Sequence, residues 1–154
     1  MEQHDYSCAF AVAQSPQEAW DAICRVNDWW TRNMEGSARH AGDQFRVRFA
    51  ATYVEFRVVE QEPTHTMKWL VTDCHLAWLD DKKEWKDTQL VFELETTGPE
   101  THVRLTHLGL VPRIPCFEDC RKGWDFYAGV SLRQLIQTGT GSPDAGVTAR
   151  TDAN

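Results

Sequence analysis

The stretch Gln44-Phe45-Arg46-Val47-Arg48-Phe49 decides the fold, because its large apolar side chains alternate strictly with polar ones. A period of two is typical of a β-strand that buries one face. The same alternation recurs in four later stretches. Their inward-facing members are Val54, Phe56 and Val58; Met67, Trp69 and Val71; Leu90, Phe92 and Leu94; and Val103, Leu105 and His107. Five successive one-sided strands predict an antiparallel meander with one wet face.

The segment before the meander mixes strand and helix signals. Residues 5–13 alternate in the same way and predict a first strand. Ser15-Pro16-Gln17-Glu18 has the N-cap, first-turn proline and capping-box glutamate of a helix start. We expect a second short helix after it, capped by Asn27 and carrying Trp29-Trp30.

The segment after the meander changes to a helical period. From about Cys116 to about Thr138, apolar side chains recur every three or four positions, so we expect one long helix with one apolar face. A helix of about 22 residues is roughly 33 Å long, enough to cross a sheet. Gly139 ends this helix, and the small polar residues of 140–154 predict a disordered tail. We therefore expect a single domain over residues 1–139.

The whole-chain composition excludes some partners. The chain has 154 residues and a formal net charge of −7. An acidic chain is a poor ligand for nucleic-acid phosphates or for an anionic membrane surface, so we expect neither partner. The five cysteines are an odd number, and the first residues contain no apolar signal core. Both observations indicate free thiols and a cytoplasmic location.

Several short stretches occur in the order typical of one known family. They are residues 10–12 and 15–23, Trp29-Trp30, Glu35-Gly36, residues 42–45 and 58–63, Trp69, residues 105–110, Gly123-Trp124 and Ser131-Leu132. In these stretches the chain resembles the heat-shock-protein ATPase activator-like family, often labelled SRPBCC, of the START-like superfamily. The resemblance spans about residues 5 to 139. It implies an α+β helix-grip fold: a curved antiparallel β-sheet wrapped around a long C-terminal α-helix, with two short helices after the first strand.

A curled sheet covered by one helix leaves a wide interior, which side chains, water or a ligand must fill. We expect an apolar or aromatic small molecule to bind in this cavity, between the sheet and the C-terminal helix. The residues expected to line it are Phe49, Phe56, Met67, Trp69, Phe92, His107, Trp124 and Tyr127. The alternative for the rings is a packed aromatic core, and the alternative for His107 is a buried side chain with structural partners. Of Trp29-Trp30, we expect one ring in the core and one over the cavity mouth.

The sequence carries no motif that assigns a reaction. It has no Gly-rich phosphate loop, no nucleophile elbow and no paired CxxC. Cys116 and Cys120 form one pair only, too few ligands for zinc, so we expect no metal and no cofactor. A binding module is therefore expected rather than an enzyme. Two alternatives remain: a protein-interaction or chaperone-activator-like module with a protein partner or a second copy, and a cyclase- or dehydratase-like enzyme with His107 and Tyr127 as acid–base groups.

Overall fold

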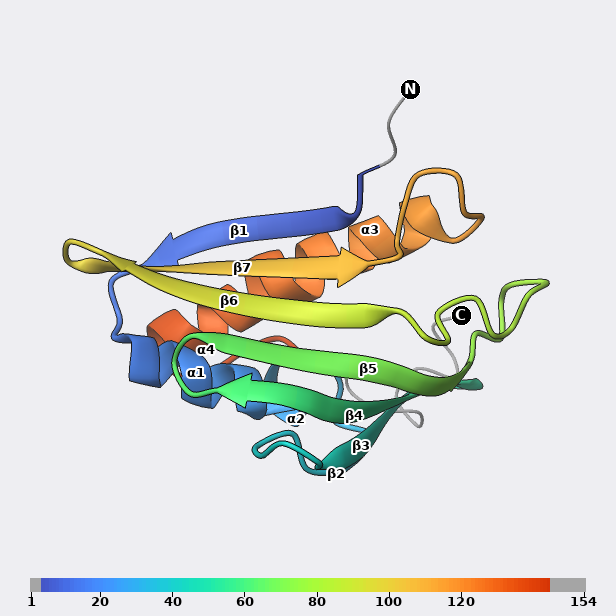
Figure 1. Ribbon diagram of the computed structural model, residues 1–154, viewed down its shortest axis with the longest axis horizontal. Helices are drawn as coiled ribbons and strands as arrows, with labels where there is room; N and C mark the ends of the chain where they lie inside the picture. The colour runs from blue at the N-terminus through green and yellow to red at the C-terminus, as the bar shows by residue number, and fades with distance from the viewer. Residues whose placement is uncertain (1–3, 145–154) are drawn as a thin grey trace.

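The protein is a seven-stranded antiparallel sheet that curls around a long C-terminal helix (Figure 1). The computed structural model describes residues 4–144. The strands lie side by side in the order β1-β7-β6-β5-β4-β3-β2. Their bounds are β1 Tyr6–Val12, β2 Met34–Gly36, β3 Gln44–Phe49, β4 Thr52–Glu62, β5 Thr66–His75, β6 Gln89–Thr97 and β7 Glu100–Leu108. The predicted α+β helix-grip architecture is confirmed.

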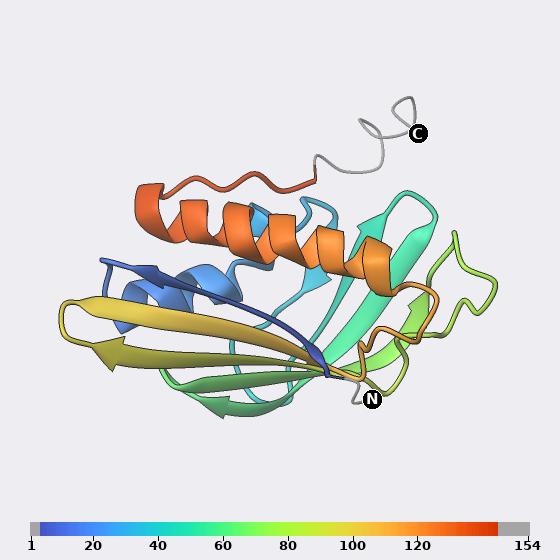
Figure 2. The same ribbon diagram turned by 90° about the horizontal axis from the view of Figure 1, so that it is seen from above.

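The sheet is a meander because successive strands from β2 to β7 pair with each other. A turn of only two residues joins β3 to β4, since Phe49 pairs with Thr52. The register of β4 against β5 shifts at two places along β4. Such irregularities bend a strand and increase its twist. The sheet therefore curls, and Figure 2 shows it closing around the helix that crosses its inner face.

The first helix, α1 (Pro16–Cys24), begins where the sequence predicts it. The Glu18 backbone N–H donates to Ser15 Oγ at 3.1 Å, and the Ser15 backbone N–H donates to the Glu18 carboxylate at 3.0 Å. This reciprocal capping box pairs two backbone donors that the start of a helix leaves unpaired.

The region after α1 differs from the expectation in two details. The single-turn helix α2 (Val26–Trp29) begins two residues earlier than expected, with Arg25 rather than Asn27 at its N-cap. The short strand β2 then pairs with β3, where the sequence predicted no strand. Three residues at an edge are too short to show a clear period of two.

The C-terminal helix covers 22 residues in three consecutive segments: α3 (Phe117–Phe126), η1 (Tyr127–Leu132) and α4 (Arg133–Thr138). The middle segment, η1, is a π-helical turn, which is wider than an α-helical turn. Gly139 ends the helix in the left-handed conformation, with φ +86°. Both predicted ends of the helix lie within one residue of those observed.

The chain does not leave the domain directly after this helix. Residues 140–144, the part of the expected tail that the structure describes, run back beside α2. The Ser142 backbone N–H donates to Ser131 Oγ at 2.7 Å, and the Asp144 backbone N–H donates to the Trp30 carbonyl at 2.8 Å. The remaining residues of that predicted tail lie outside the described part of the chain.

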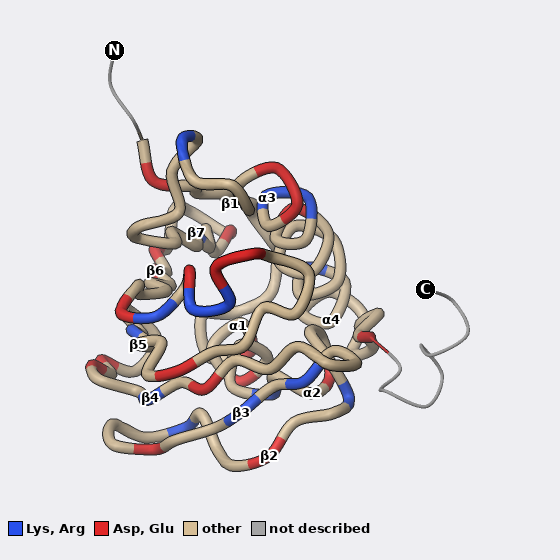
Figure 3. Tube along the Cα trace, turned by 90° about the vertical axis from the view of Figure 1, so that its right-hand side faces the viewer, with Lys and Arg blue, Asp and Glu red and all other residues tan. Residues whose placement is uncertain are grey.

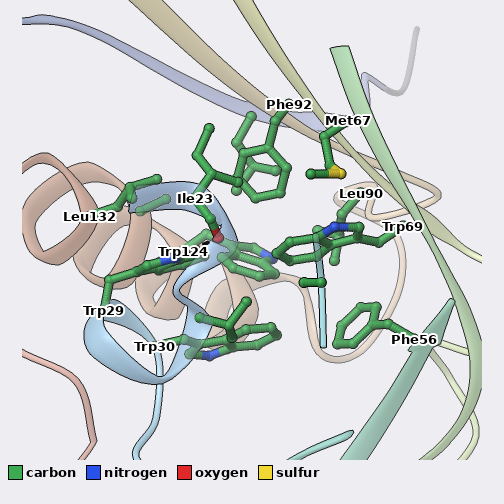
Figure 4. Close-up of a cluster of buried hydrophobic side chains, with 14 of the residues drawn as sticks. Ile23, Trp29, Trp30, Phe56, Met67, Trp69, Leu90, Phe92, Trp124 and Leu132 are labelled. Carbon is green, nitrogen blue, oxygen red and sulfur yellow. Dashed lines mark hydrogen bonds between the residues drawn. The ribbon is translucent and has the colours of Figure 1, made fainter. Parts of the chain in front are cut away.

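The core between sheet and helix is rich in aromatic rings (Figure 4). Trp29, Trp69, Trp124, Phe56 and Phe92 are among the largest fully buried side chains. The Trp69 ring centroid lies 4.8 Å from that of Phe92 and 5.5 Å from that of Phe56. Tilted rings at such spacings are favourably packed. Side chains therefore fill the middle of the interior, and the open space lies at one end.

Candidate functional site

An open pocket of about 480 Å³ lies at the end of the sheet where α3 begins. Four segments form it: the end of α2, the β3–β4 turn with the adjoining strand ends, the loop between β5 and β6, and the first half of the C-terminal helix. In Figure 1 this is the right-hand end of the molecule. We call it the aromatic pocket. It is lined by Trp30, Phe49, Ala50, Ala51, Thr52, Val54, Leu76, Ala77, Trp78, Trp85, Asp119, Cys120, Gly123, Trp124 and Tyr127.

Five rings in successive contact make one wall of the pocket. Trp85 stacks on Trp124 with 5.9 Å between ring centroids, and Trp124 lies 4.8 Å from Trp30. Phe49 continues the series, 5.7 Å from Trp30 and 6.0 Å from Tyr127. The rings come from four elements that are distant in the sequence, so the tertiary fold assembles the wall. A continuous aromatic surface of this kind suits a flat or apolar ligand.

The loop between β5 and β6 supplies the rim. It carries Trp78, whose exposed fraction is 51%. The loop is held by hydrogen bonds at its base: the Ala77 backbone N–H donates to Thr52 Oγ1 at 2.9 Å, and Lys82 Nζ donates to the Ala77 carbonyl at 2.9 Å. Trp78 therefore projects from a braced loop and not from a loose one.

His107 lies behind the pocket wall and is fully buried. Trp124 Nε1 donates to His107 Nδ1 at 3.1 Å, so Nδ1 carries no proton. The proton is therefore on Nε2, which lies 2.9 Å from Thr88 Oγ1. Thr88 Oγ1 in turn donates to the Trp85 carbonyl at 2.6 Å. Both ring nitrogens are satisfied by the protein itself, and His107 holds the Trp124 indole by a direct hydrogen bond. The Trp85 ring packs edge-on against the imidazole, with 4.6 Å between ring centroids.

Burial also fixes the charge of His107. Removal from water lowers the pKa of this imidazole to about 3. A second proton on Nδ1 would face the Trp124 indole N–H, a donor opposite a donor. The side chain is therefore neutral near neutral pH, and its place is structural.

Few polar groups reach the pocket. Among the described residues that line it, the ionisable side chains are Asp119, Cys120 and Tyr127. Cys120 Sγ accepts a hydrogen bond from Trp85 Nε1 at 3.3 Å. Over residues 4–144, no group of three or more His, Cys, Asp or Glu side chains is placed to hold a metal ion. The arrangement suits binding by shape and ring contact better than acid–base chemistry.

The residues predicted from the sequence divide into two groups. Phe49, Trp124 and Tyr127 line the aromatic pocket. The other five do not line the pocket and are at most 1% exposed: Phe56, Met67, Trp69, Phe92 and His107. The lining residues absent from the predicted set include Trp30, Trp78, Trp85 and Asp119. The sequence did predict one ring of Trp29-Trp30 in the core and the other at the cavity mouth. In the structure Trp29 is in the core and Trp30 borders the pocket.

Comparison with known proteins places the fold. No protein-family model and no curated protein matches the chain. The Aha1 dimer from Colwellia psychrerythraea, a solution structure, is 23% identical, with a TM-score of 0.71 over 92% of this chain and 100% of that one. DynU16, from the dynemicin biosynthetic locus, is 18% identical, with a TM-score of 0.63 over 88% of this chain and 48% of that one. CalU16 from Micromonospora echinospora is 15% identical, with a TM-score of 0.62 over 88% and 76%.

Over residues 4–144, no helix is both long and apolar enough to cross a membrane. The solved structures align over most of the described chain, and they share its curled sheet and its long C-terminal helix. The protein therefore has the helix-grip fold.

Proposed function

We propose that the chain is a small START-like binding domain that takes up an apolar or aromatic small molecule in the aromatic pocket. One observation carries the proposal: an open pocket of about 480 Å³ whose wall is a continuous series of rings. This volume lies within the range typical of small-molecule sites, roughly 300–1,000 Å³. Binding would remove apolar surface of both the ligand and the pocket wall from water, which favours the complex.

The test uses a substitution that fills the pocket. Gly123 lines the pocket from the helix, and a Cβ at this position meets no atom within 4 Å. Gly123→Leu would therefore extend into open space without a clash in the core, while improving helix propensity. We expect it to weaken the binding of the neutral dye Nile red by about tenfold or more, read as loss of the fluorescence gain.

The matched control is Gly129→Leu in the same helix. A Cβ at Gly129 also meets no atom within 4 Å, but Gly129 does not line the pocket. This variant should keep the dye affinity of the unmodified protein. Absence of dye binding to the unmodified protein, or equal losses in the two variants, would refute the proposed site.

A protein-interaction role is the second candidate, and exposed apolar side chains favour it. Phe126 and Val130 lie one turn apart on the helix and are 43% and 50% exposed. Exposed apolar clusters often mark contact surfaces, and the similar Aha1 protein from Colwellia psychrerythraea is described as a dimer. A second copy of this chain is the partner to test first. A monomer by light scattering at about 100 μM would argue against it, and a dimer lost in Phe126→Ser would support it.

The acid–base role considered for His107 and Tyr127 finds little support. His107 does not line the pocket, and both its ring nitrogens are hydrogen-bonded to Trp124 and Thr88. A general base must reach the substrate proton directly or through one water. The binding proposal therefore stands ahead of the enzymatic one.

A further inference from the structure

We propose that the ligand of the aromatic pocket is an organic cation: an ammonium or quaternary ammonium group carried on an apolar body. This inference rests on the proposed function of the same pocket and narrows it to one charge class. Three features point to it: an unpaired carboxylate in the lining, a wall of π faces, and the engagement of the nearby lysines outside the pocket.

The carboxylate belongs to Asp119, in the first turn of α3. Among the described residues that line the pocket, it is the side chain that bears a formal charge. It makes no hydrogen bond or ion pair with any residue of the described chain. Its neighbours differ: Glu118 and Asp125 both bind Arg121, at 2.7 and 3.1 Å. Asp119 therefore presents a negative charge that no described side chain neutralises, and an ammonium group would gain from it.

The rings supply the second feature. The face of an aromatic ring carries negative electrostatic potential, and indole attracts cations most strongly. The indole donors of two wall residues are already used. Trp85 Nε1 donates to Cys120 Sγ, and Trp124 Nε1 donates to His107 Nδ1. These two side chains thus offer the pocket carbon and π surface but no free N–H, which suits a cation.

Nearby positive groups supply the third feature, because they are engaged outside the pocket. Lys82 Nζ donates to the Ala77 carbonyl at 2.9 Å, and Lys83 Nζ pairs with Asp73 at 2.8 Å. Neither lysine lines the pocket. Figure 3, which looks onto this end of the molecule, shows acidic and basic segments side by side around it. The net charge of −7 adds a long-range attraction for cations.

The experiment compares two ligands of the same shape. Benzyltrimethylammonium carries a quaternary nitrogen, and neopentylbenzene has carbon in its place. Each competes against Nile red for the unmodified protein. The neutral compound is more hydrophobic, so burial alone would favour it. We expect the cation to displace the dye with an apparent Kd about tenfold lower than that of its neutral counterpart.

Two variants locate the charge effect. Asp119→Asn keeps the shape of the side chain and should weaken the cation about fivefold, with the neutral compound and the dye unchanged. Glu118→Gln removes the same charge from the same helical turn, but outside the pocket, and should leave all three affinities unchanged. Melting curves of both variants check that the first turn of α3, where acidic side chains favour the helix dipole, stays folded.

The outcomes separate the two proposals. Equal or weaker binding of the cation than of the neutral compound overturns the present inference, and dye binding then leaves the proposed function standing. Equal weakening by Glu118→Gln and Asp119→Asn also overturns it, because the effect is then one of overall charge. Failure of the dye and of both compounds to bind removes the proposed function, and this inference with it.

Discussion

Acidification from pH 7 to about pH 4.5 is expected to lower the free energy of unfolding by about 2.5 kcal/mol through His107 alone. The native state holds this side chain neutral, because burial lowers its pKa from 6.5 to about 3. The unfolded chain, by contrast, takes up a proton as the pH falls through 6.5. Since the unfolded state then binds more protons than the native state, stability is full above pH 6.5 and falls as the pH drops toward 3.

The magnitude follows from the two pKa values. Between pH 6.5 and about pH 3, each unit of acidification lowers the free energy of unfolding by about 1.4 kcal/mol. About two of these units lie between pH 6.5 and pH 4.5. The side chain has no solvent-exposed surface, so water does not screen the effect. The carboxyl groups whose pKa values are lowered, such as Asp43 and Asp73, lose their contribution only at lower pH.

The assay is urea unfolding followed by tryptophan fluorescence at several pH values from 7 to about 4.5. His107→Gln should be less stable at pH 7, because it disturbs the bonds to Trp124 and Thr88, but its stability should vary little over this pH range. His102→Gln, an exposed histidine on the same strand, should keep the slope of the unmodified protein. A slope that survives in His107→Gln would refute the assignment of the proton to this residue.

Two pairs of backbone positions offer further tests, both read by urea unfolding. Ala50 has φ +55° at the first position of the two-residue turn, where glycine is preferred, so Ala50→Gly should stabilise the protein by about 1 kcal/mol. Ala51→Gly, at a position without positive φ, should not, and an equal gain would contradict this reasoning. Gly36 and Gly42 both have positive φ, but a Cβ at Gly36 would lie 2.2 Å from the Gln44 carbonyl oxygen, and one at Gly42 meets nothing within 4 Å. Gly36→Ala should therefore cost at least about 2 kcal/mol more than Gly42→Ala, and similar costs would show that the neighbouring strand yields.

The strands and the long helix were predictable because their apolar faces repeat with a fixed period. Alternation alone places His107 on the buried face of β7, and it is fully buried there. The period says nothing about its partners. Trp124 and Thr88 reach it from a helix and a loop, and only the tertiary fold brings these segments together.

The position of the pocket was less predictable than the fold. The sequence predicted a cavity between the sheet and the C-terminal helix, but bulky rings such as Trp69 fill the middle of this interior and leave space at one end. Trp78 and Trp85 lie in an irregular loop, where no repeat indicates the direction of a side chain. Asp119 is an acidic residue in the first turn of α3, and its place in the pocket lining depends on how α3 meets the loop.

The return of the chain beside α2 after Gly139 affects how the last helix can open. Three backbone amides hold it there: Ser142 to Ser131 Oγ, Asp144 to the Trp30 carbonyl, and Arg32 to the Asp144 carbonyl. The end of the helix is thereby anchored to the segment that follows α2 and cannot fray as a free terminus would. In amide hydrogen exchange, these three protons should share one slow opening rate, so that residues from opposite ends of the chain behave as one cooperative unit.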